Sequence, residues 1–402
     1  MTTTVRPIKV LHLVGQLDPG GIETWLLNLV RLRSEEVRFD FVVGEPDGRY
    51  EEEMRGYGCR IHMLDYRSRF RKRLEVVGLA RRSRSLDSIL AENDYDVFHV
   101  HGEEFMGDAL KVAAEAGIPV RVAHCHASVL ARGKRNPEMA LRAMRFRTLD
   151  RRRILMYATD ICAVSNEAGR FLMGSHWEAD PRCRALYCGV PLDCIREVAD
   201  TPDPVVYRES HGIPRCGIIV GHVGSMGPSP VKNHLFLLEV FDVLSRRDDR
   251  YYLYLAGDGP LRSAIERDVR RRGLQERVFM PGLSKDVPAL MMHGFDAFLL
   301  PSLHEGLPVV GLEAVAAGLY TVCSDAITRD FTDRFRDRVA AVSLKASPSH
   351  WADQVEIAVK KRVPPAEGIA FIENSPFSIR ASLSALTGLY SGRLAELPQP
   401  RC

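Results

Sequence analysis

The chain consists of short apolar runs that alternate with longer helix-like runs. Runs rich in Val, Ile, Leu and Phe are typical of strands buried on both faces of a parallel sheet, and the helical runs between them supply the crossover connections. The predicted strands of the first half are residues 10–14, 39–43, 97–100, 120–123 and 161–164. Those of the second half are residues 218–223, 251–256, 278–280, 297–300 and 321–323.

This alternation predicts an α/β fold with two Rossmann-like halves. A chain of 402 residues is longer than one hydrophobic core usually supports, so two domains are expected. Residues 199–204 contain two aspartates and two prolines and are the best linker candidate between the halves.

Composition places the chain among ordinary cytoplasmic proteins. Its 46% hydrophobic and 27% charged residues are typical of a globular domain, and no apolar run approaches the roughly 20 residues of a membrane span. The first residues run directly into a predicted strand, without the pattern of a signal peptide. Nine cysteines without CxxC pairs argue against a disulfide framework or a zinc site, so we expect reduced thiols.

The segment FLLPSLHEGLPVVGLE, residues 298–313, is the most informative candidate site. Its apolar run predicts a buried strand, the Gly306-Leu307-Pro308 turn breaks the chain, and the following small-residue run predicts a helix that ends at Gly318. Glu305 would follow the strand and Glu313 would lie about one turn into the helix. Ligands of open α/β sheets bind at this edge, where helix N-termini offer free N–H groups to phosphate.

Two glycine loops are placed to approach a phosphate. Gly20 and Gly21 follow the first strand, and a second loop follows the strand at 218–223 and contains Lys232 just before a helix. The GxGxxG fingerprint of dinucleotide-binding proteins is absent, which disfavours an NAD enzyme.

These motifs resemble the family 4 retaining glycosyltransferases, and the resemblance covers nearly the whole chain. It implies a GT-B fold, in which two Rossmann-like domains face each other across a cleft. Residues 1–198 would form the acceptor domain and 205–375 the nucleotide-sugar domain, while 376–402 would cross back to the first domain. It also implies that Glu305 lies against the donor sugar and that Glu313 binds the ribose hydroxyls, which suits a charged acceptor.

The resemblance assigns roles to further residues. His126 would contact the donor sugar near the transferred carbon, and Lys232 would neutralise the leaving diphosphate. The loop with Gly20 and Gly21 would approach the donor phosphates and the acceptor. Backbone groups around Gly282 and Leu283 would meet the base, and the turn at Gly306, Leu307 and Pro308 would line the substrate site.

The sequence departs from the family pattern at two positions. An arginine usually follows the Val-Gly of the second phosphate loop, but Ser225 stands there, and a hydroxyl cannot replace bidentate phosphate binding. Either another arginine reaches the site or the donor is held more weakly. In YCGVPLD, Cys188 and Pro191 replace the usual polar pair.

No metal site is predicted. His124 and His126 form an HxH pair and His101 follows another strand, but no carboxylate or cysteine spacing completes a ligand set. His101 and His124 are as well explained as structural residues. Asp94-Tyr95-Asp96 precedes its strand and would lie at the wrong end of the sheet for a metal diphosphate site. The family resemblance implies catalysis without a metal ion and without any cofactor besides the nucleotide-sugar substrate.

Two basic stretches, residues 66–86 and 142–153, concentrate positive charge in a chain whose net charge is only +3. Arginines interleaved with apolar residues suit either an anionic membrane surface or a solvated helix face. Neither stretch belongs to a nucleic-acid-binding motif.

We therefore expect a retaining glycosyltransferase that moves a sugar, from a UDP-sugar donor, to a polysaccharide or lipid-linked acceptor in bacterial exopolysaccharide or capsule synthesis. It would be cytoplasmic or peripheral at the inner face of the plasma membrane. Two alternatives remain: a catalytically silent nucleotide-sugar-binding partner, which Ser225 favours, and a GT-B epimerase or phosphorylase.

Overall fold

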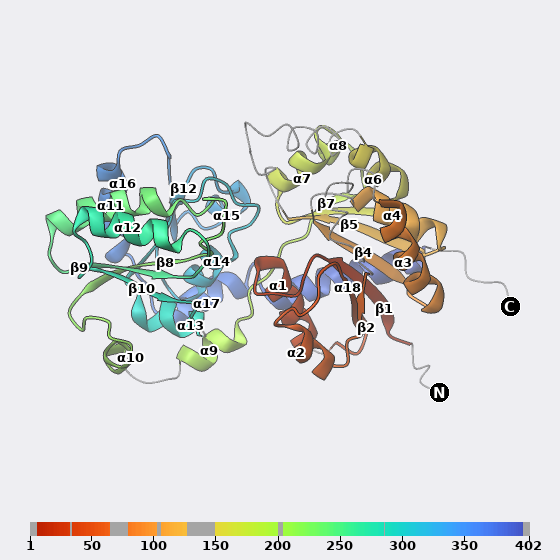
Figure 1. The fold of residues 1–402 in the computed structure, drawn as a ribbon, viewed down its shortest axis with the longest axis horizontal. Helices are drawn as coiled ribbons and strands as arrows, with labels where there is room; N and C mark the ends of the chain where they lie inside the picture. The colour runs from red at the N-terminus through yellow and green to blue at the C-terminus, as the bar shows by residue number, and fades with distance from the viewer. Residues whose placement is uncertain are drawn as a thin grey trace. The chain divides into compact units, whose positions relative to one another are not determined.

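The computed structural model describes residues 6–32, 34–64, 79–102, 106–126, 149–199, 204–284 and 286–396, with the side chains of 79–85 left out. The chain divides into two compact units (Figure 1). The first comprises residues up to Cys188 together with the segment from Ile379 onward, and the second runs from Gly189 to Ser378.

The first unit contains a seven-stranded parallel sheet in the order β3-β2-β1-β4-β5-β6-β7. Strands β2 and β3 continue the sheet beyond β1, whereas β5, β6 and β7 continue it beyond β4. The direction of winding therefore reverses between β1 and β4. The strands are β1 Ile8–Val14, β2 Val37–Val43, β3 Ile61–Met63, β4 Val97–Gly102, β5 Val120–Cys125, β6 Asp160–Ala163 and β7 Cys183–Ala185.

Helices connect these strands and cover the sheet. They are α1 Gly21–Arg31, α2 Glu51–Gly56, α3 Leu79–Glu92, α4 Met106–Glu115, α6 Arg151–Tyr157, α7 Asn166–Met173 and α8 His176–Ala179. The last helix, α18 (Ile379–Ala395), belongs to this unit although it ends the described chain, and it packs on α1 and β5.

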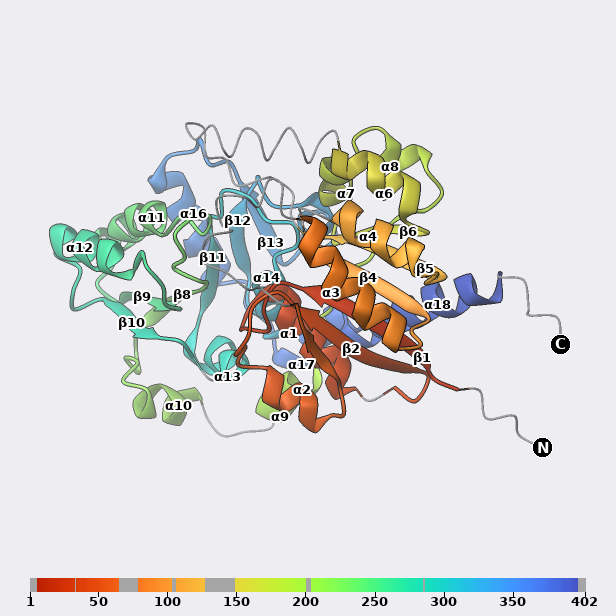
Figure 2. The same cartoon turned by 45° about the vertical axis from the view of Figure 1, so that its right-hand side comes forward.

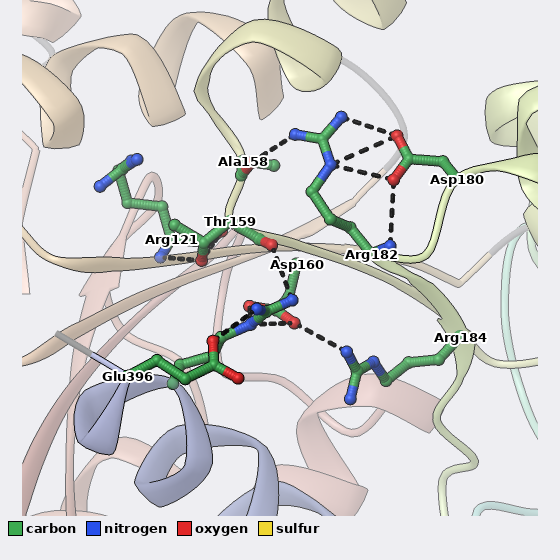
Figure 3. A network of polar contacts seen from close by, with 9 residues as sticks. Arg121, Ala158, Thr159, Asp160, Asp180, Arg182, Arg184 and Glu396 are labelled. Carbon is green, nitrogen blue, oxygen red and sulfur yellow. Dashed lines mark hydrogen bonds and ion pairs between the residues drawn. The ribbon is translucent and has the colours of Figure 1, made fainter.

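A buried carboxylate joins α18 to β6. Asp160 is fully buried, and its oxygens accept hydrogen bonds from Arg393 of α18 at 2.9 and 3.0 Å and from Arg184 of β7 at 3.1 Å. Figure 3 shows Arg184 directed at this carboxylate. Because a buried carboxylate is costly without partners, the two arginines tie the C-terminal helix to the sheet.

The second unit contains a six-stranded parallel sheet in the order β10-β9-β8-β11-β12-β13. Its strands are β8 Ile218–Val223, β9 Tyr251–Ala256, β10 Val278–Gly282, β11 Ala297–Leu300, β12 Thr321–Ser324 and β13 Val339–Val342. Its helical segments are α9 Asp193–Ala199, α10 Pro204–Ser210, α11 His234–Arg247, α12 Arg262–Arg272, α13 Val287–Ala289, the π-helical turn Leu290–Gly294, α14 Val309–Ala316, α15 Arg329–Thr332, α16 Pro348–Val359 and α17 Pro365–Glu373.

Helices distant in sequence complete the core of this unit. In both ribbon views α11 lies beside α16 (Figures 1 and 2), and the two helices are in contact. Leu237, Leu238 and Phe241 of α11 are fully buried in one cluster with Trp351 and Val355 of α16. Burying such side chains stabilises each by about 1.5–3 kcal/mol relative to exposure, which fixes α11 and the loop before it.

The ten predicted strands are present, and the structure adds β3, β7 and β13. The units divide at Cys188–Gly189, before the boundary that the sequence suggested, and α9 packs on α13 and α17 of the second unit. Most of the suggested linker, residues 200–203, lies outside the described residues. Among the helices of the described ranges, none is long and apolar enough to cross a membrane.

We predict that Asp160→Asn lowers the free energy of unfolding by about 1.5–3 kcal/mol, because charge-assisted hydrogen bonds to two arginines are lost from a buried position. The matched control is Glu396→Gln, which removes a 67% exposed partner of the same Arg393 and should change stability by less than about 0.5 kcal/mol. Urea unfolding followed by circular dichroism measures both. Equal effects of the two substitutions would contradict the role given to Asp160.

Candidate active site

The second unit has its topological switch point between β8 and β11, which are hydrogen-bonded neighbours. Strands β9 and β10 continue the sheet on one side, and β12 and β13 on the other. In open parallel sheets, ligands bind outside the carboxyl ends of the strands at such a switch point, which is where the loops after β8 and β11 begin. Lys232 lies in the first loop and Glu305 in the second.

Lys232 and Glu305 form an ion pair at this point. The Lys232 Nζ lies 2.6 Å from Glu305 Oε1, and their side chains are only 21% and 14% exposed. Ser302 also donates a hydrogen bond to Glu305 Oε1, at 2.8 Å. A pair in this partly desolvated setting is stronger than a surface pair, so the cation is held at the switch point before any ligand arrives.

Hydrogen bonds between the two loops fix the position of Lys232. The Leu303 amide donates to the Val231 carbonyl at 2.8 Å, and the Asn233 side-chain amide donates to the Pro301 carbonyl at 3.1 Å. Asn233 adopts a left-handed conformation with φ 56°, which Asn tolerates better than most residues. This residue turns the chain from Lys232 directly into α11.

Glu313 lies on α14, the helix that follows the Glu305 loop. Desolvation raises its pKa to about 7, while the positive charge of Lys232 acts in the opposite direction. Lys232 thus acts electrostatically on Glu313 as well as pairing with Glu305. The structure brings together the three charged residues that the sequence singled out in this half.

Glycines allow the backbone of the neighbouring loop to pack closely. Gly257 and Gly259 have φ of 145° and 147°, and a Cβ on either would overlap the Gly224 or Met226 carbonyl. The Gly257 amide donates to the Gly282 carbonyl at 2.8 Å, which joins β9 to β10 beside the site. Gly257 and Gly259 are thus required for this close contact.

The other predicted substrate residues lie in the loops that follow β8, β10 and β11. Leu283 follows Gly282 and is 60% exposed, Leu307 is buried, and Pro308 caps α14. Ser225 is exposed in the loop after β8. The arginine Arg262 has its Nη1 3.6 Å from where a Gly282 Cβ would lie, but it is bonded to Glu266 and the Met280 carbonyl.

Two histidines beside Lys232 were not recognised from the sequence. His222 is the penultimate residue of β8 and His234 begins α11, with ring centroids 5.0 Å apart. Burial lowers both pKa values, that of His234 to about 4, and the Lys232 charge acts in the same direction. The Nε2 of each ring is buried without a hydrogen-bond partner in the described structure. In the sequence, the only indication that they lie near the site is that His222 precedes the glycine loop and that His234 follows Lys232 by two positions.

In the first unit, five histidines gather on one face of the central strands. His12 comes from β1, His99 and His101 from β4, His124 from β5 and His126 from the position directly after β5. The Trp25 ring of α1 packs edge-on against His124, with centroids 5.6 Å apart. The sequence singled out His101, His124 and His126 but missed His12 and His99, which the parallel register brings to the other three.

The five histidines form two chains of hydrogen bonds, here called files. One file joins Tyr390, His99 and His124 and ends at the Leu186 carbonyl, with distances of 2.6, 3.2 and 3.1 Å. The carbonyl can only accept, so His124 Nε2 carries hydrogen and its Nδ1 accepts from His99 Nε2.

The other file joins His12, His101 and His126, at 2.8 and 3.0 Å, and reaches the Cys188 sulfur 3.7 Å from His126 Nδ1. Burial lowers the pKa of His12 and His124 to about 3 and those of His99, His101 and His126 well below the ordinary value. The cluster is therefore neutral at physiological pH.

The remaining predicted features of this unit lie at opposite ends of its sheet. Gly20 precedes and Gly21 begins α1 after the carboxyl end of β1, as expected for a loop at a ligand-binding edge. Asp96 instead accepts from the Lys9 amide at 2.9 Å and from Arg6, at the amino ends of β1 and β4. This placement agrees with a structural role for Asp96.

Family models match both units. A model described as "Glycosyltransferase Family 4" matches residues 19–193, and one described as "Glycosyl transferases group 1" matches residues 217–360. A similar curated protein is "Putative glycosyltransferase EpsF" of Bacillus subtilis, 33% identical over 387 residues that cover 95% of this chain and 96% of that protein.

Two further comparisons extend this similarity. A GDP-mannose:cellobiosyl-diphosphopolyprenol alpha-mannosyltransferase of Xanthomonas oryzae is 26% identical, covering 84% of this chain and 88% of that one. The crystal structure of Anabaena Alr3699/HepE in complex with UDP superposes with a TM-score of 0.76 at 17% identity, covering 96% of this chain and all of that one, which shows the shared fold. Together with the switch-point geometry, these similarities show that the chain belongs to the family 4 glycosyltransferases, of GT-B fold.

Proposed function

We propose that the protein is a retaining, metal-independent glycosyltransferase that moves a sugar from a UDP-sugar to a polysaccharide or lipid-linked acceptor. The observation that carries this proposal is the set of Lys232, Glu305 and Glu313 at the switch point of a family 4 member. One cation beside two carboxylates suits a ligand that carries both a diphosphate and vicinal hydroxyls.

Lys232 is the residue proposed to bind the diphosphate. Its ammonium group is already at the carboxyl edge of β8 and is paired with Glu305 at 2.6 Å. An incoming diphosphate offers a larger negative charge than one carboxylate and would share or take over the ammonium hydrogens. As the bond to the sugar breaks, negative charge grows on the leaving oxygen, and a fixed cation stabilises it most at that stage.

The two glutamates are proposed to bind the rest of the donor. Once phosphate binds Lys232, a carboxylate oxygen of Glu305 becomes available to accept hydrogen bonds from the sugar hydroxyls. The hydrogen bond from Ser302 keeps the Glu305 carboxylate in place. Glu313 is proposed to accept from the ribose hydroxyls, which requires its ionised form. Its pKa of about 7 means that ionisation is half complete near neutrality and is favoured by those hydrogen bonds.

His126 is proposed to act near the transferred carbon. Its low pKa keeps the imidazole neutral, so it can accept from or donate to a sugar hydroxyl without adding charge. Gly20 and Gly21 at the start of α1 are proposed to approach the donor phosphates and acceptor. Backbone groups around Gly282 and Leu283 are proposed to meet the base.

The nature of donor and acceptor draws on the relatives. One relative is named for GDP-mannose and a polyprenol-linked acceptor, and a structural neighbour of low identity binds UDP. These names support a nucleotide-sugar donor and a lipid-linked glycan acceptor, with UDP as the proposed nucleotide. The exposed Ser225 in place of arginine favours a second candidate, a silent partner subunit that binds the donor without transferring it.

We predict slow hydrolysis of one nucleotide sugar from a panel of UDP-, GDP- and ADP-sugars, and a roughly 10²-fold loss of that turnover in Lys232→Ala. Lys345→Ala, which removes an exposed lysine of the same unit, should turn over like the parent. Nucleotide release measured by chromatography gives the rates. Binding of a donor without any turnover would favour the silent partner, and unchanged turnover in Lys232→Ala would remove Lys232 from the mechanism.

We also propose that the basic segment of residues 66–86 attaches the enzyme to anionic membrane. Residues 65–78 lie outside the described ones, and α3 begins at Leu79 within the segment. Each basic residue near an anionic surface contributes about 1 kcal/mol, so several suffice for reversible binding.

Sedimentation with liposomes tests this attachment. We predict recovery with anionic but not neutral vesicles, weakened by salt and by Arg81→Glu combined with Arg82→Glu. The control pair, Arg334→Glu with Arg336→Glu, reverses two exposed arginines of the other unit. Equal recovery with both vesicle types would identify the segment as an ordinary solvated surface.

A further inference from the structure

Three of the five clustered histidines meet around one point at the carboxyl end of β4 and β5. His101, His124 and His126 each offer a ring nitrogen, and these three nitrogens all lie within 4.8 Å of one another. We propose that they form a binding site for a divalent transition-metal ion of the zinc class. The sequence argued against a metal because no carboxylate or cysteine spacing completed a ligand set around these histidines. The structure brings His101 of β4, 23 positions before His124, to the HxH pair as a third imidazole.

The spacing of the nitrogens fits such an ion. Tetrahedral zinc with nitrogen ligands at about 2.0–2.1 Å holds those nitrogens about 3.3 Å apart. His101 Nδ1 and His126 Nε2 are 3.0 Å apart, joined by a shared hydrogen. An ion therefore needs a small opening of this pair and a turn of the His124 ring toward it.

The protonation of the cluster also suits metal binding. Zinc requires neutral imidazole, and burial already keeps these rings neutral. The Leu186 carbonyl holds the His124 hydrogen on Nε2, which leaves Nδ1, now the acceptor of the His99 Nε2 hydrogen, as the nitrogen for the ion. The turn of the ring toward the ion replaces this bond from His99 with the bond to the metal. When the ion binds, the hydrogen now between His101 Nδ1 and His126 Nε2 must move to the other nitrogen of the ring that carries it. In His126 that other nitrogen is Nδ1, which faces the Cys188 sulfur.

The ligand set selects the kind of ion. Three imidazoles without a carboxylate suit zinc, copper or nickel and do not suit magnesium or calcium, which prefer oxygen. Among the two histidine triads of the described residues, this one includes a partly exposed member, His126, whereas His12, His99 and His101 are all buried. Three ligands leave a fourth position for water.

Occupation of the site has a consequence for catalysis. An ion on His126 withdraws the imidazole that the proposed function assigns to the donor sugar, so zinc is expected to inhibit transfer. This consequence rests on the proposed function. Binding of the ion does not, and the two are measured separately.

Zinc binding is tested by competition with a chromophoric chelator on the full-length protein. The parent is expected to bind one equivalent of Zn²⁺ that Mg²⁺ does not displace, and His126→Asn and His101→Gln are expected to weaken it at least 100-fold. His350→Asn, which changes an exposed histidine of the other unit, and Cys216→Ser, which removes an exposed thiol, are expected to keep it. Thermal unfolding without metal shows whether each variant is folded.

Cobalt supplies a readout that does not depend on any variant. Co²⁺ bound to three histidines and water is expected to show the intense visible absorption of tetrahedral nitrogen coordination, which zinc removes. Weak octahedral absorption, absence of a tight equivalent in the parent, or full affinity in folded His126→Asn would overturn the proposal. Binding without inhibition would leave the metal site intact and count against the role of His126 in transfer.

Discussion

The ion pair of Lys232 with Glu305 is the interaction on which the candidate site depends. It spans the two loops that begin at the switch point of the second sheet, and its partners are mostly buried. The pair places a cation where phosphate is expected and keeps a carboxylate neutralised until the phosphate arrives. Its position follows from the core beneath it, because α11 is anchored by Leu237, Leu238 and Phe241 and the loop bonds of Asn233 fix the chain before that helix.

In the first unit, neutral histidines rather than an ion pair occupy the central strands of the sheet. Its central strands carry neutral imidazoles, which hydrogen-bond one another in files and end at a tyrosine, a carbonyl and a thiol. Such files satisfy buried polar atoms in a region that a parallel sheet would otherwise fill with aliphatic side chains. The unpartnered Nε2 of His12 is the exception within the described cluster. Neutral imidazoles are also metal ligands, so the arrangement that satisfies the core creates a binding capacity that apolar residues would lack.

Sequence reasoning identified the strands with long apolar runs and the loops that follow them. It missed β3 and β7, short edge strands whose residues are mostly only partly buried, and β13, whose two central alanines give a weak strand signal. The positions of Glu305, Glu313 and Lys232 were predictable: Lys232 and Glu305 lie in the loops after β8 and β11, and Glu313 lies about one turn into the helix that follows Glu305. The histidine cluster was predictable only in part: the sequence singled out His101, His124 and His126, but only the register of β1, β4 and β5 adds His12 and His99. The proximity of His222 and His234 to Lys232 likewise depends on the turn at Asn233.

In the proposed function, the second unit binds a nucleoside diphosphate through the ionised carboxylate of Glu313. Calorimetric titration of UDP and GDP into the parent and Glu313→Gln, at about pH 6 and pH 8, tests it most directly. With a Glu313 pKa of about 7, the carboxylate is ionised at the higher pH and must lose a proton on binding at the lower one. We predict that the parent binds about 10- to 100-fold more tightly than the variant at pH 8 and that this ratio of affinities narrows at pH 6. Protonation of the free nucleotide affects both proteins alike. Equal dissociation constants for parent and variant at pH 8 would show that the Glu313 carboxylate does not bind the nucleotide.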